Sequence, residues 1–255
     1  MTPNPRSPSG RAGAPAAPHP PGAAAPPLPA VRKAHRLLER RFGPLDPPRR
    51  LDPLEELILT VLSQNTSDVN RDRAYASLTS RFRTWKEVVD ADPQDVADAI
   101  RPGGLANTKA PRIQAILRAV EERHGSLDLG FLHRMRDDEI RDYLLELPGV
   151  GPKTAACVLA FSLERPAIPV DTHVRRAAER LAWIPPRASD TGAHAILEKV
   201  VPPTLRITMH VGLIRLGRAI CKPGRPKCEE CPLQEICPTA PTVLSGAWDP
   251  DRRSG

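Results

Sequence analysis

Apolar residues recur at spacings of three and four along most of the chain beyond position 30, and this periodicity predicts helices. It is clear in the segment PLEELILTVLSQ, in the segment that ends at Gly125, and over residues 172–182, 191–201 and 204–220. No segment alternates apolar and polar residues as a half-buried strand does. The pattern therefore predicts an all-α fold built from many short helices.

Polar residues that favour helix starts precede these apolar segments. Two of them, in Asp-Pro pairs, put proline at the first helical position, and a Thr with a Glu three residues later forms a capping box. We expect helix N-caps at Asp52, Thr84, Asp92, Asn107 and Asp137.

The two ends of the chain differ from the helical middle. Residues 1–30 contain 10 prolines, many alanines and no acidic residue, a composition that buries too little apolar area to offset the entropy of ordering. We expect a disordered Pro/Ala-rich tail over 1–30 and a flexible tail over 241–255.

The charge balance indicates the class of partner. Lys and Arg outnumber Asp and Glu by 37 to 30, which gives a net charge of +7 and favours a polyanion, with nucleic acid as the first candidate. No apolar run reaches the roughly 18 residues of a membrane span, and the chain does not start like a secretion signal. We expect no membrane partner and a cytoplasmic, nucleoid-associated location in a bacterium.

The segment LPGVGPKTAACVLAF predicts a tight turn followed at once by a helix. Its two glycines let the backbone come close to a partner, and the first turn of a helix carries N–H groups without an internal acceptor. Such a turn suits an anion, above all a phosphate. The backbone amides of Gly149, Val150 and Gly151 are the candidate donors.

Four of the five cysteines gather in a short segment with the pattern C-x6-C-x2-C-x5-C, which indicates a metal site or two disulfides. Without a secretion signal the thiols are expected to stay reduced, which disfavours disulfides. The spacing alone leaves zinc and an iron–sulfur cluster open. The candidate ligands are Cys221, Cys228, Cys231 and Cys237.

Three motifs in order, LPGVGPKTAACVLAF, IPVDTHVRR and the four-cysteine segment, resemble the endonuclease III family of base-excision DNA glycosylases. The resemblance covers roughly residues 51–238. It implies a six-helix barrel domain with a helix-hairpin-helix over 51–162. It also implies a second helical domain, formed by 31–50 and 163–240, whose four cysteines hold a [4Fe-4S] cluster. DNA is expected to lie across the cleft between the two domains.

The resemblance also implies two catalytic residues. Lys153, in the first turn of the helix after the glycine turn, would attack C1′ of the damaged nucleotide, displace the base and hold the sugar as a Schiff base. Asp171 has the position of an ordinary helix N-cap, and the family motif adds the role of a carboxylate that stabilises positive charge at C1′. Pro152 departs from the basic residue that some family members carry before the lysine.

Two loops match those with which the family opens the duplex. In LSQNTSD, Asn65 aligns best as the residue that fills the gap left by the extruded base, with Gln64 as the neighbouring alternative. In GGLANTKA, Leu105 aligns as the wedge that intercalates between bases. A helix cap and a surface leucine are the ordinary structural interpretations of these two positions.

The loop between the first two cluster cysteines is basic, and in the family this loop contacts the DNA backbone. Its cations are Lys222, Arg225 and Lys227, which a solvated surface loop would also carry. Cys157 lies apart from the other cysteines on an apolar helix, where core packing is expected.

These features predict a bifunctional DNA glycosylase and abasic-site lyase that removes oxidised pyrimidines and cleaves the strand by β-elimination. Its partner would be double-stranded DNA with damaged bases or abasic sites, bound by a monomer. One alternative is a monofunctional mismatch or uracil-type glycosylase, and Lys153 argues against it. The other is a DNA-binding module that uses its cluster for redox sensing, against which Lys153 and Asp171 argue together.

Overall fold

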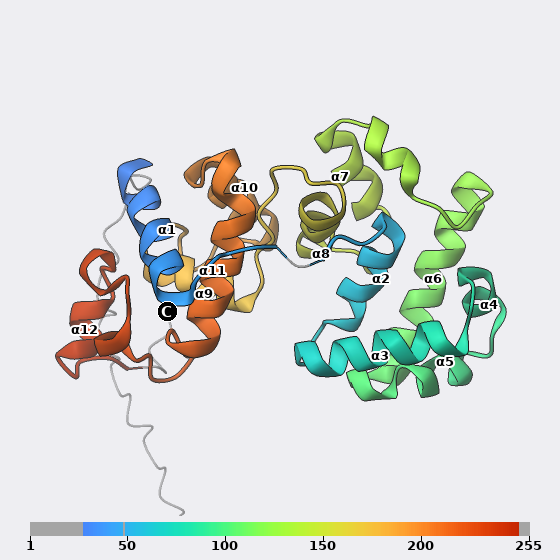
Figure 1. The fold of residues 1–255 in the computed structure, drawn as a ribbon, viewed down its shortest axis with the longest axis horizontal. Helices are drawn as coiled ribbons and strands as arrows, with labels where there is room; N and C mark the ends of the chain where they lie inside the picture. Colours follow the sequence, from blue (N-terminus) through green and yellow to red (C-terminus); the bar gives the residue numbers. More distant parts are fainter. Residues whose placement is uncertain (1–27, 48, 250–255) are drawn as a thin grey trace, which may run out of the picture.

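The computed structural model describes residues 28–47 and 49–249, which form a two-part helical structure without strands in those ranges (Figure 1). The all-α prediction is confirmed. The helices of the first part of the chain are α1 (Leu28–Phe42), α2 (Pro53–Leu62), α3 (Asp68–Arg81), α4 (Trp85–Asp90), α5 (Pro93–Ala99) and α6 (Ala106–His124). The later ones are α7 (Asp137–Leu145), α8 (Pro152–Cys157), α9 (Thr172–Arg180), α10 (Asp190–Val200), α11 (Arg206–Ala219) and α12 (Ala240–Leu244).

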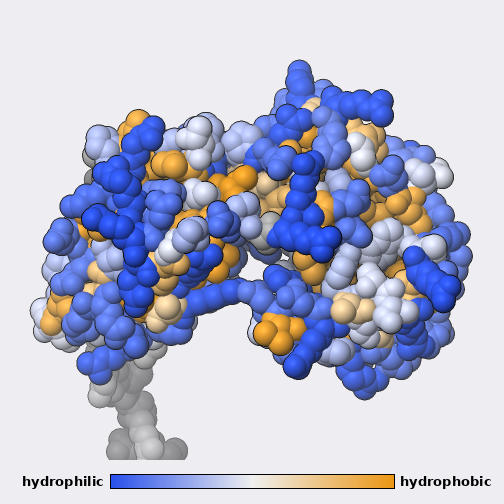
Figure 2. All heavy atoms as spheres, viewed as in Figure 1, coloured by the Kyte–Doolittle hydropathy of each residue, from blue (hydrophilic) through white to orange (hydrophobic). Residues whose placement is uncertain are grey.

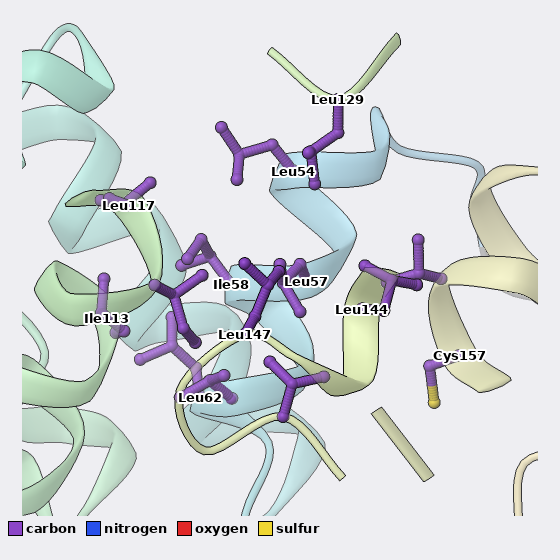
Figure 3. Close-up of a cluster of buried hydrophobic side chains, with 14 of the residues drawn as sticks. Leu54, Leu57, Ile58, Leu62, Ile113, Leu117, Leu129, Leu144, Leu147 and Cys157 are labelled. Atoms are coloured by element: carbon purple, nitrogen blue, oxygen red, sulfur yellow. The ribbon is translucent and has the colours of Figure 1, made fainter. Parts of the chain in front are cut away.

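One hydrophobic core lies among α2 to α8 and a π-helical segment, Val158–Ser162, that continues α8. Helix α2 supplies its centre, with leucine and isoleucine side chains that meet those of α6 (Figure 3). The labelled residues of these two helices are Leu54, Leu57, Ile58, Leu62, Ile113 and Leu117. Burying such a side chain contributes roughly 1.5–3 kcal/mol, so α2 is fixed firmly, and the loop after it starts from a rigid element.

A second core brings the two ends of the described chain together. Val31, Ala34 and Leu38 of α1 pack with residues of α9, α10 and α11. Helix α1 comes close to α11 because Gly212 has no side chain; a Cβ there would lie 3.1 Å from Leu38 Cδ1. The α1 helix thus belongs to the same half as the four-cysteine segment, as Figure 1 shows.

The change from one core to the other falls between Ala167 and Ile168. This is a few residues later than the boundary expected at 163, because Leu163 and Ala167 still pack into the first core. Figure 2 shows the two halves with an opening between them in that view.

Three of the five expected N-caps are confirmed. Asp52 forms a capping box with Glu55, Thr84 accepts the N–H of Glu87, and the Asp92 side chain caps α5. These caps depend only on residues within one helical turn, which explains why the local sequence predicts them.

The other two N-caps were wrong by one or two residues. Helix α6 starts after Leu105 rather than after Asn107, since Gly104 and Leu105 both adopt positive φ and end the preceding turn. Helix α7 is preceded by Arg136, so Asp137 lies inside its first turn. A carboxylate there remains favourable because it faces the positive end of the helix dipole.

The predicted tails fall only partly within the described residues. Residues 1–27 lie outside them, while α1 already begins at Leu28. The expected flexible tail over 241–255 starts instead with α12, and Trp248 then donates a 2.9 Å hydrogen bond to Gly224 O. No described helix combines the length and the apolar character needed to cross a membrane.

Candidate functional site

Lys153 lies at the start of α8, beside the end of α2. Gly151 is the N-cap and Pro152 the first helical residue, an order that sets the helix start sharply. The half-buried Lys153 side chain directs Nζ toward Ser63 Oγ, 3.5 Å away, and Ser63 Oγ in turn donates to Thr60 O at 2.7 Å. The amine therefore lies against the loop that follows α2.

Asp171 caps α9 from the other half of the structure. Its Oδ1 accepts hydrogen bonds from the backbone N–H groups of His173 at 2.9 Å and Val174 at 2.8 Å. This is the N-cap geometry expected from the sequence, and it fixes the orientation of the carboxylate.

A buried histidine contacts the segments that carry these two residues. His210 on α11 is 4% exposed, and its Nδ1–H donates to Pro169 O at 2.7 Å. Burial lowers the pKa of His210 to about 4; Asp171 opposes this shift and Lys153 adds to it. The His210 ring also lies 5.4 Å from the ring of Phe161, in the segment that continues α8. His210 therefore contacts both the helix of Lys153 and the segment that leads to Asp171.

An ion pair spans the two halves near this neighbourhood. Arg218 of α11 donates from Nη2 to Asp68 Oδ1 of α3 at 3.0 Å. The hydrogen bond from Arg218 holds the pKa of Asp68 below its usual value, and Asp171 also favours the charged form of Arg218. The pair joins the segment after α2 to the helix that carries His210.

The glycine turn packs closely against the side chain of Arg112 on α6. Gly149 has φ of +73°, and a Cβ at this position would lie 2.9 Å from Arg112 Cδ. Arg112 Nη1 donates to Gln64 Oε1 at 2.8 Å. Glycine is required here by the backbone conformation and by the close approach of the arginine.

The expectation that three successive amides face a phosphate needs one correction. The Val150 side chain is buried, and its N–H already donates to Leu147 O at 3.1 Å within the turn. A tight turn uses one of its own amides to close, which leaves Gly149 and Gly151 as the candidate donors. Around Gly151 there is open space where a side chain would be.

The two loop residues expected to open the duplex share an unusual backbone conformation. Asn65 has φ of 51° and Leu105 φ of 50°, and both are exposed, Leu105 by 55%. Left-handed backbone is strained for leucine, so this apolar side chain is held outward against both local and solvation preferences. Gln64 is engaged by Arg112, which favours Asn65 over it as the gap-filling residue.

Lys109 ties these two loops together, a role that the sequence did not indicate. Its amine is buried, with the residue 2% exposed, and donates to Leu62 O at 2.8 Å and to Gly103 O at 2.9 Å. Leu62 precedes the loop of Asn65, and Gly103 precedes Leu105. A lysine inside an otherwise apolar helical face is the signal that would have identified it.

The four clustered cysteines line one largely apolar cavity with side chains such as Leu216, Ile220 and Leu233. All four thiols are free, and burial raises the pKa of three of them, that of Cys231 to about 11. Among the described residues, no three His, Cys, Asp or Glu side chains are grouped to hold a single metal ion. Thiolates spread around a cavity suit a cluster with several iron atoms at its corners.

Arg180 holds the loop of this cavity in shape. Its Nη1 donates to Cys221 Sγ at 3.1 Å and to Lys222 O at 2.8 Å, and its Nη2 donates to Pro223 O at 2.9 Å. The Arg180 Cζ atom also lies over the Trp248 ring, 4.9 Å from the centroid of that ring. The loop cations Lys222, Arg225 and Lys227 are exposed, and Lys227 pairs with Glu230 at 3.2 Å.

Comparison with known proteins defines the family. Residues 58–203 match the HhH-GPD superfamily of base excision DNA repair proteins, and residues 221–237 match the iron-sulfur binding domain of endonuclease III. The first match covers more than half of the chain, so the protein belongs to the HhH-GPD superfamily. It is an endonuclease III-like base excision DNA glycosylase with an iron–sulfur binding domain, and the predicted family is confirmed.

Individual relatives agree with this assignment. Endonuclease III of Thermotoga maritima is 39% identical over 189 residues, which cover 74% of this chain and 84% of that protein. A putative DNA glycosylase of Arabidopsis thaliana is 36% identical, over 71% of this chain and 64% of that protein. The DNA glycosylase/AP lyase ROS1 of the same plant is 32% identical over 170 residues, 60% of this chain and 12% of its own length.

A solved structure shows the same fold bound to DNA. The trapped covalent intermediate of an endonuclease III with DNA matches with a TM-score of 0.72 and 29% identity, over 84% of this chain and 97% of that one. A non-covalent endonuclease III–DNA complex gives the same values.

Proposed function

We propose that this protein is a bifunctional DNA glycosylase that removes oxidised pyrimidines from duplex DNA and then cleaves the strand at the abasic site. One observation carries the proposal: Lys153 and Asp171 come from different halves of the molecule, and His210 contacts the segments that carry both, through Pro169 O at 2.7 Å and the Phe161 ring at 5.4 Å. A nucleophile and an anion around one point suit displacement at a sugar carbon that develops positive charge.

In this mechanism the lone pair of Lys153 Nζ attacks C1′ while the bond from C1′ to the base breaks. The Asp171 carboxylate stabilises the positive charge that develops at C1′, and its orientation is fixed beforehand by the α9 cap. The resulting amine adduct opens to a Schiff base, and loss of a C2′ proton then breaks the bond to the 3′ oxygen. Two of the similar proteins support this chemistry. ROS1 is a DNA glycosylase/AP lyase, and an endonuclease III forms a covalent intermediate with DNA that can be trapped.

We propose further that a single copy of the chain binds the damaged duplex through backbone and loop contacts. Gly149 and Gly151 bind a phosphate, Asn65 fills the gap left by the extruded base, and Leu105 wedges into the stack. The cations of the loop between the first two cluster cysteines add phosphate contacts that are independent of sequence. These are Lys222, Arg225 and Lys227.

The iron–sulfur group proposed here is a [4Fe-4S] cluster held by Cys221, Cys228, Cys231 and Cys237. The fit rests on four free thiols around one largely apolar cavity and on the match of residues 221–237 to the iron-sulfur binding domain of endonuclease III. When bound, the cluster supplies four iron–thiolate bonds that cross-link the C-terminal segment. Arg180, which also lines the cavity, orients the basic loop by its bonds to Lys222 O and Pro223 O.

A panel of duplexes, each with one lesion, tests the function. Strand cleavage without alkali at an oxidised pyrimidine is the expected result. Cleavage only after alkali would instead indicate a monofunctional mismatch or uracil-type glycosylase. Binding without any base release would instead support a DNA-binding module that uses its cluster for redox sensing.

A further inference from the structure

Arg112 of α6 lies between the glycine turn and the loop that follows α2. A Cβ at Gly149 would lie 2.9 Å from both Cδ and Nε of Arg112, whose Nη1 donates to Gln64 Oε1 at 2.8 Å. Gly149 is a candidate phosphate donor, and Gln64 directly precedes Asn65, the candidate gap-filling residue. The function described so far gives this arginine no part in binding DNA.

The three segments that meet at this arginine are fixed by the first core. Each of the three contacting residues has a buried neighbour within two positions in the sequence, and these neighbours are Leu62, Ile113 and Leu147. Figure 3 shows their side chains gathered in one core. Because close-packed segments shift little, the guanidinium is held beside the glycine turn before any DNA binds.

The bond to Gln64 leaves one edge of the guanidinium open. The group carries five N–H donors, and Nη1 is the nitrogen that Gln64 engages. Nε and Nη2 form the edge that binds two oxygens of a carboxylate or phosphate side by side. Since Nε is the nitrogen that lies against Gly149, this edge is the one next to the glycine turn.

This edge of Arg112 has no protein partner. Over residues 28–47 and 49–249, no carboxylate pairs with Arg112, and the contact with Gln64 is its single hydrogen bond. The buried side-chain atoms that lack a partner in these ranges are Gln114 Oε1 and Tyr143 OH, so Nε and Nη2 of Arg112 reach solvent. The residue as a whole is half-buried. A cation that has lost part of its hydration without gaining a counter-ion favours a bound anion.

We propose that Arg112 binds, through its Nε–Nη2 edge, the same DNA phosphate as the amides of Gly149 and Gly151. Its Nη1 holds Gln64 at the same time, and thereby positions the loop of Asn65 relative to that phosphate. The inference rests on the proposed function, in which the glycine turn binds a phosphate. The two amides are neutral donors, and the arginine supplies the full positive charge that the turn itself lacks.

The salt dependence of binding separates this role from a structural one. A cation that neutralises a phosphate releases a counterion, so its loss lowers the slope of log Kd against log salt concentration by about 0.9. An arginine that only supports the turn and the loop would weaken binding at every salt concentration alike. The decisive quantity is therefore the slope.

The test measures Kd for a duplex with one tetrahydrofuran abasic-site analogue over a series of KCl concentrations. Arg112→Gln keeps an amide donor near Gln64 but loses the charge. We expect its slope to fall by about 0.9 and its Kd at low salt to rise roughly 10- to 100-fold. Arg112→Lys keeps a charge without the planar fork, so it should keep the slope and lose less affinity. Arg118→Gln is the matched control, because Arg118 is exposed on the same helix and donates to Val89 O.

A second measurement locates the phosphate on the DNA. A neutral methylphosphonate replaces one phosphate at a time along the same duplex. At one position the replacement should weaken binding of the wild type but add little in Arg112→Gln, since both changes remove the same contact. If Arg112→Gln fails to fold, Arg112→Lys takes its place in this scan and should show a reduced penalty at that one position.

An unchanged salt slope in Arg112→Gln would overturn the inference, and so would methylphosphonate penalties equal to those of the wild type at every position. An equal fall in slope in Arg118→Gln would also overturn it, because the effect would then come from net charge. Wild-type protein that binds the analogue duplex but never cleaves a lesion duplex would instead refute the proposed lyase function. The two failures are therefore distinguishable.

Discussion

The buried amine of Lys109 on α6 donates a 2.8 Å hydrogen bond to the backbone carbonyl of Leu62, the last residue of α2. Its second bond, to Gly103 O, reaches the turn before Leu105. One side chain thus sets the separation of the two loops proposed to fill and wedge the duplex. The loops are held from behind, by a residue that is too deeply buried to contact DNA.

Replacing Lys109 with methionine should loosen both loops. The variant keeps most of the buried volume but leaves the carbonyls of Leu62 and Gly103 without a donor, so we expect a loss of about 2–4 kcal/mol of unfolding free energy. Base extrusion should weaken more than duplex binding. Urea unfolding gives the first quantity, and the fluorescence of 2-aminopurine opposite the lesion gives the second. Equal loss of extrusion and of undamaged-duplex binding would contradict the loop-setting role.

Glu56 should make the fold less stable as the pH rises. Burial raises the pKa of this α2 side chain from 4.5 to about 7 in the folded state, so between these values the folded protein binds more protons than the unfolded chain. Stability then falls as pH increases through this window. Glu56→Gln removes the dependence and should be more stable than wild type by as much as about 3 kcal/mol at pH 8. Denaturant unfolding at pH 4.5 and 8 measures this, with Glu122→Gln on the exposed face of α6 as the matched control.

A pH-independent wild type would show that the buried carboxylate is not strained at neutral pH.

Replacing a cluster cysteine should remove the colour of the protein, whereas replacing Cys157 should not. The purified protein should be yellow-brown with about four irons per chain, and Cys228→Ser should lose both properties. Cys157→Ala should keep the colour, since this thiol lies in the other core, and should cost on the order of 1–2 kcal/mol in packing. Iron analysis and the visible spectrum provide the measurement. A colourless wild type with stoichiometric zinc and full activity would refute the cluster.

Replacing Asp171 with asparagine should separate its role as a helix N-cap from its proposed role in the chemistry. Asparagine retains an oxygen that accepts the N–H groups of His173 and Val174, so the thermal midpoint should change little. The charge that faces C1′ is lost, and base release should fall by roughly 10²–10³-fold. Single-turnover base release at saturating enzyme tests this. Turnover within a few-fold of wild type would leave Asp171 as a helix cap only.

The features that sequence analysis predicted well are local or carried by a motif. The caps at Asp52 and Thr84 depend on one helical turn, and the positions of Lys153 and Asp171 follow from motifs that set both the turn and the following helix. The cap expected at Asn107 was misplaced because Gly104 and Leu105 adopt positive φ and end the preceding turn, so the helix starts two residues earlier.

The features that sequence analysis missed arise where helices distant in sequence meet. Lys153 and Ser63 are 90 positions apart and meet only because α2 packs on α8. The neutral state of His210 likewise depends on burial between elements that no local pattern joins. The bond that occupies the Val150 amide depends on how tightly its turn closes. Periodicity predicts which face of a helix is buried, but it does not predict which polar groups meet there.

The most direct test of the account is covalent trapping by Lys153. Borohydride added during reaction with a lesion duplex should capture the wild type on DNA as a reduced Schiff base, and Lys153→Gln should abolish capture while still binding the duplex. Lys222→Gln, in the loop proposed to contact phosphate, should still be captured although its binding is weaker, and serves as the control for loss of a cation. Trapped complex at the wild-type level in Lys153→Gln would contradict the account, because the nucleophile would then be another amine.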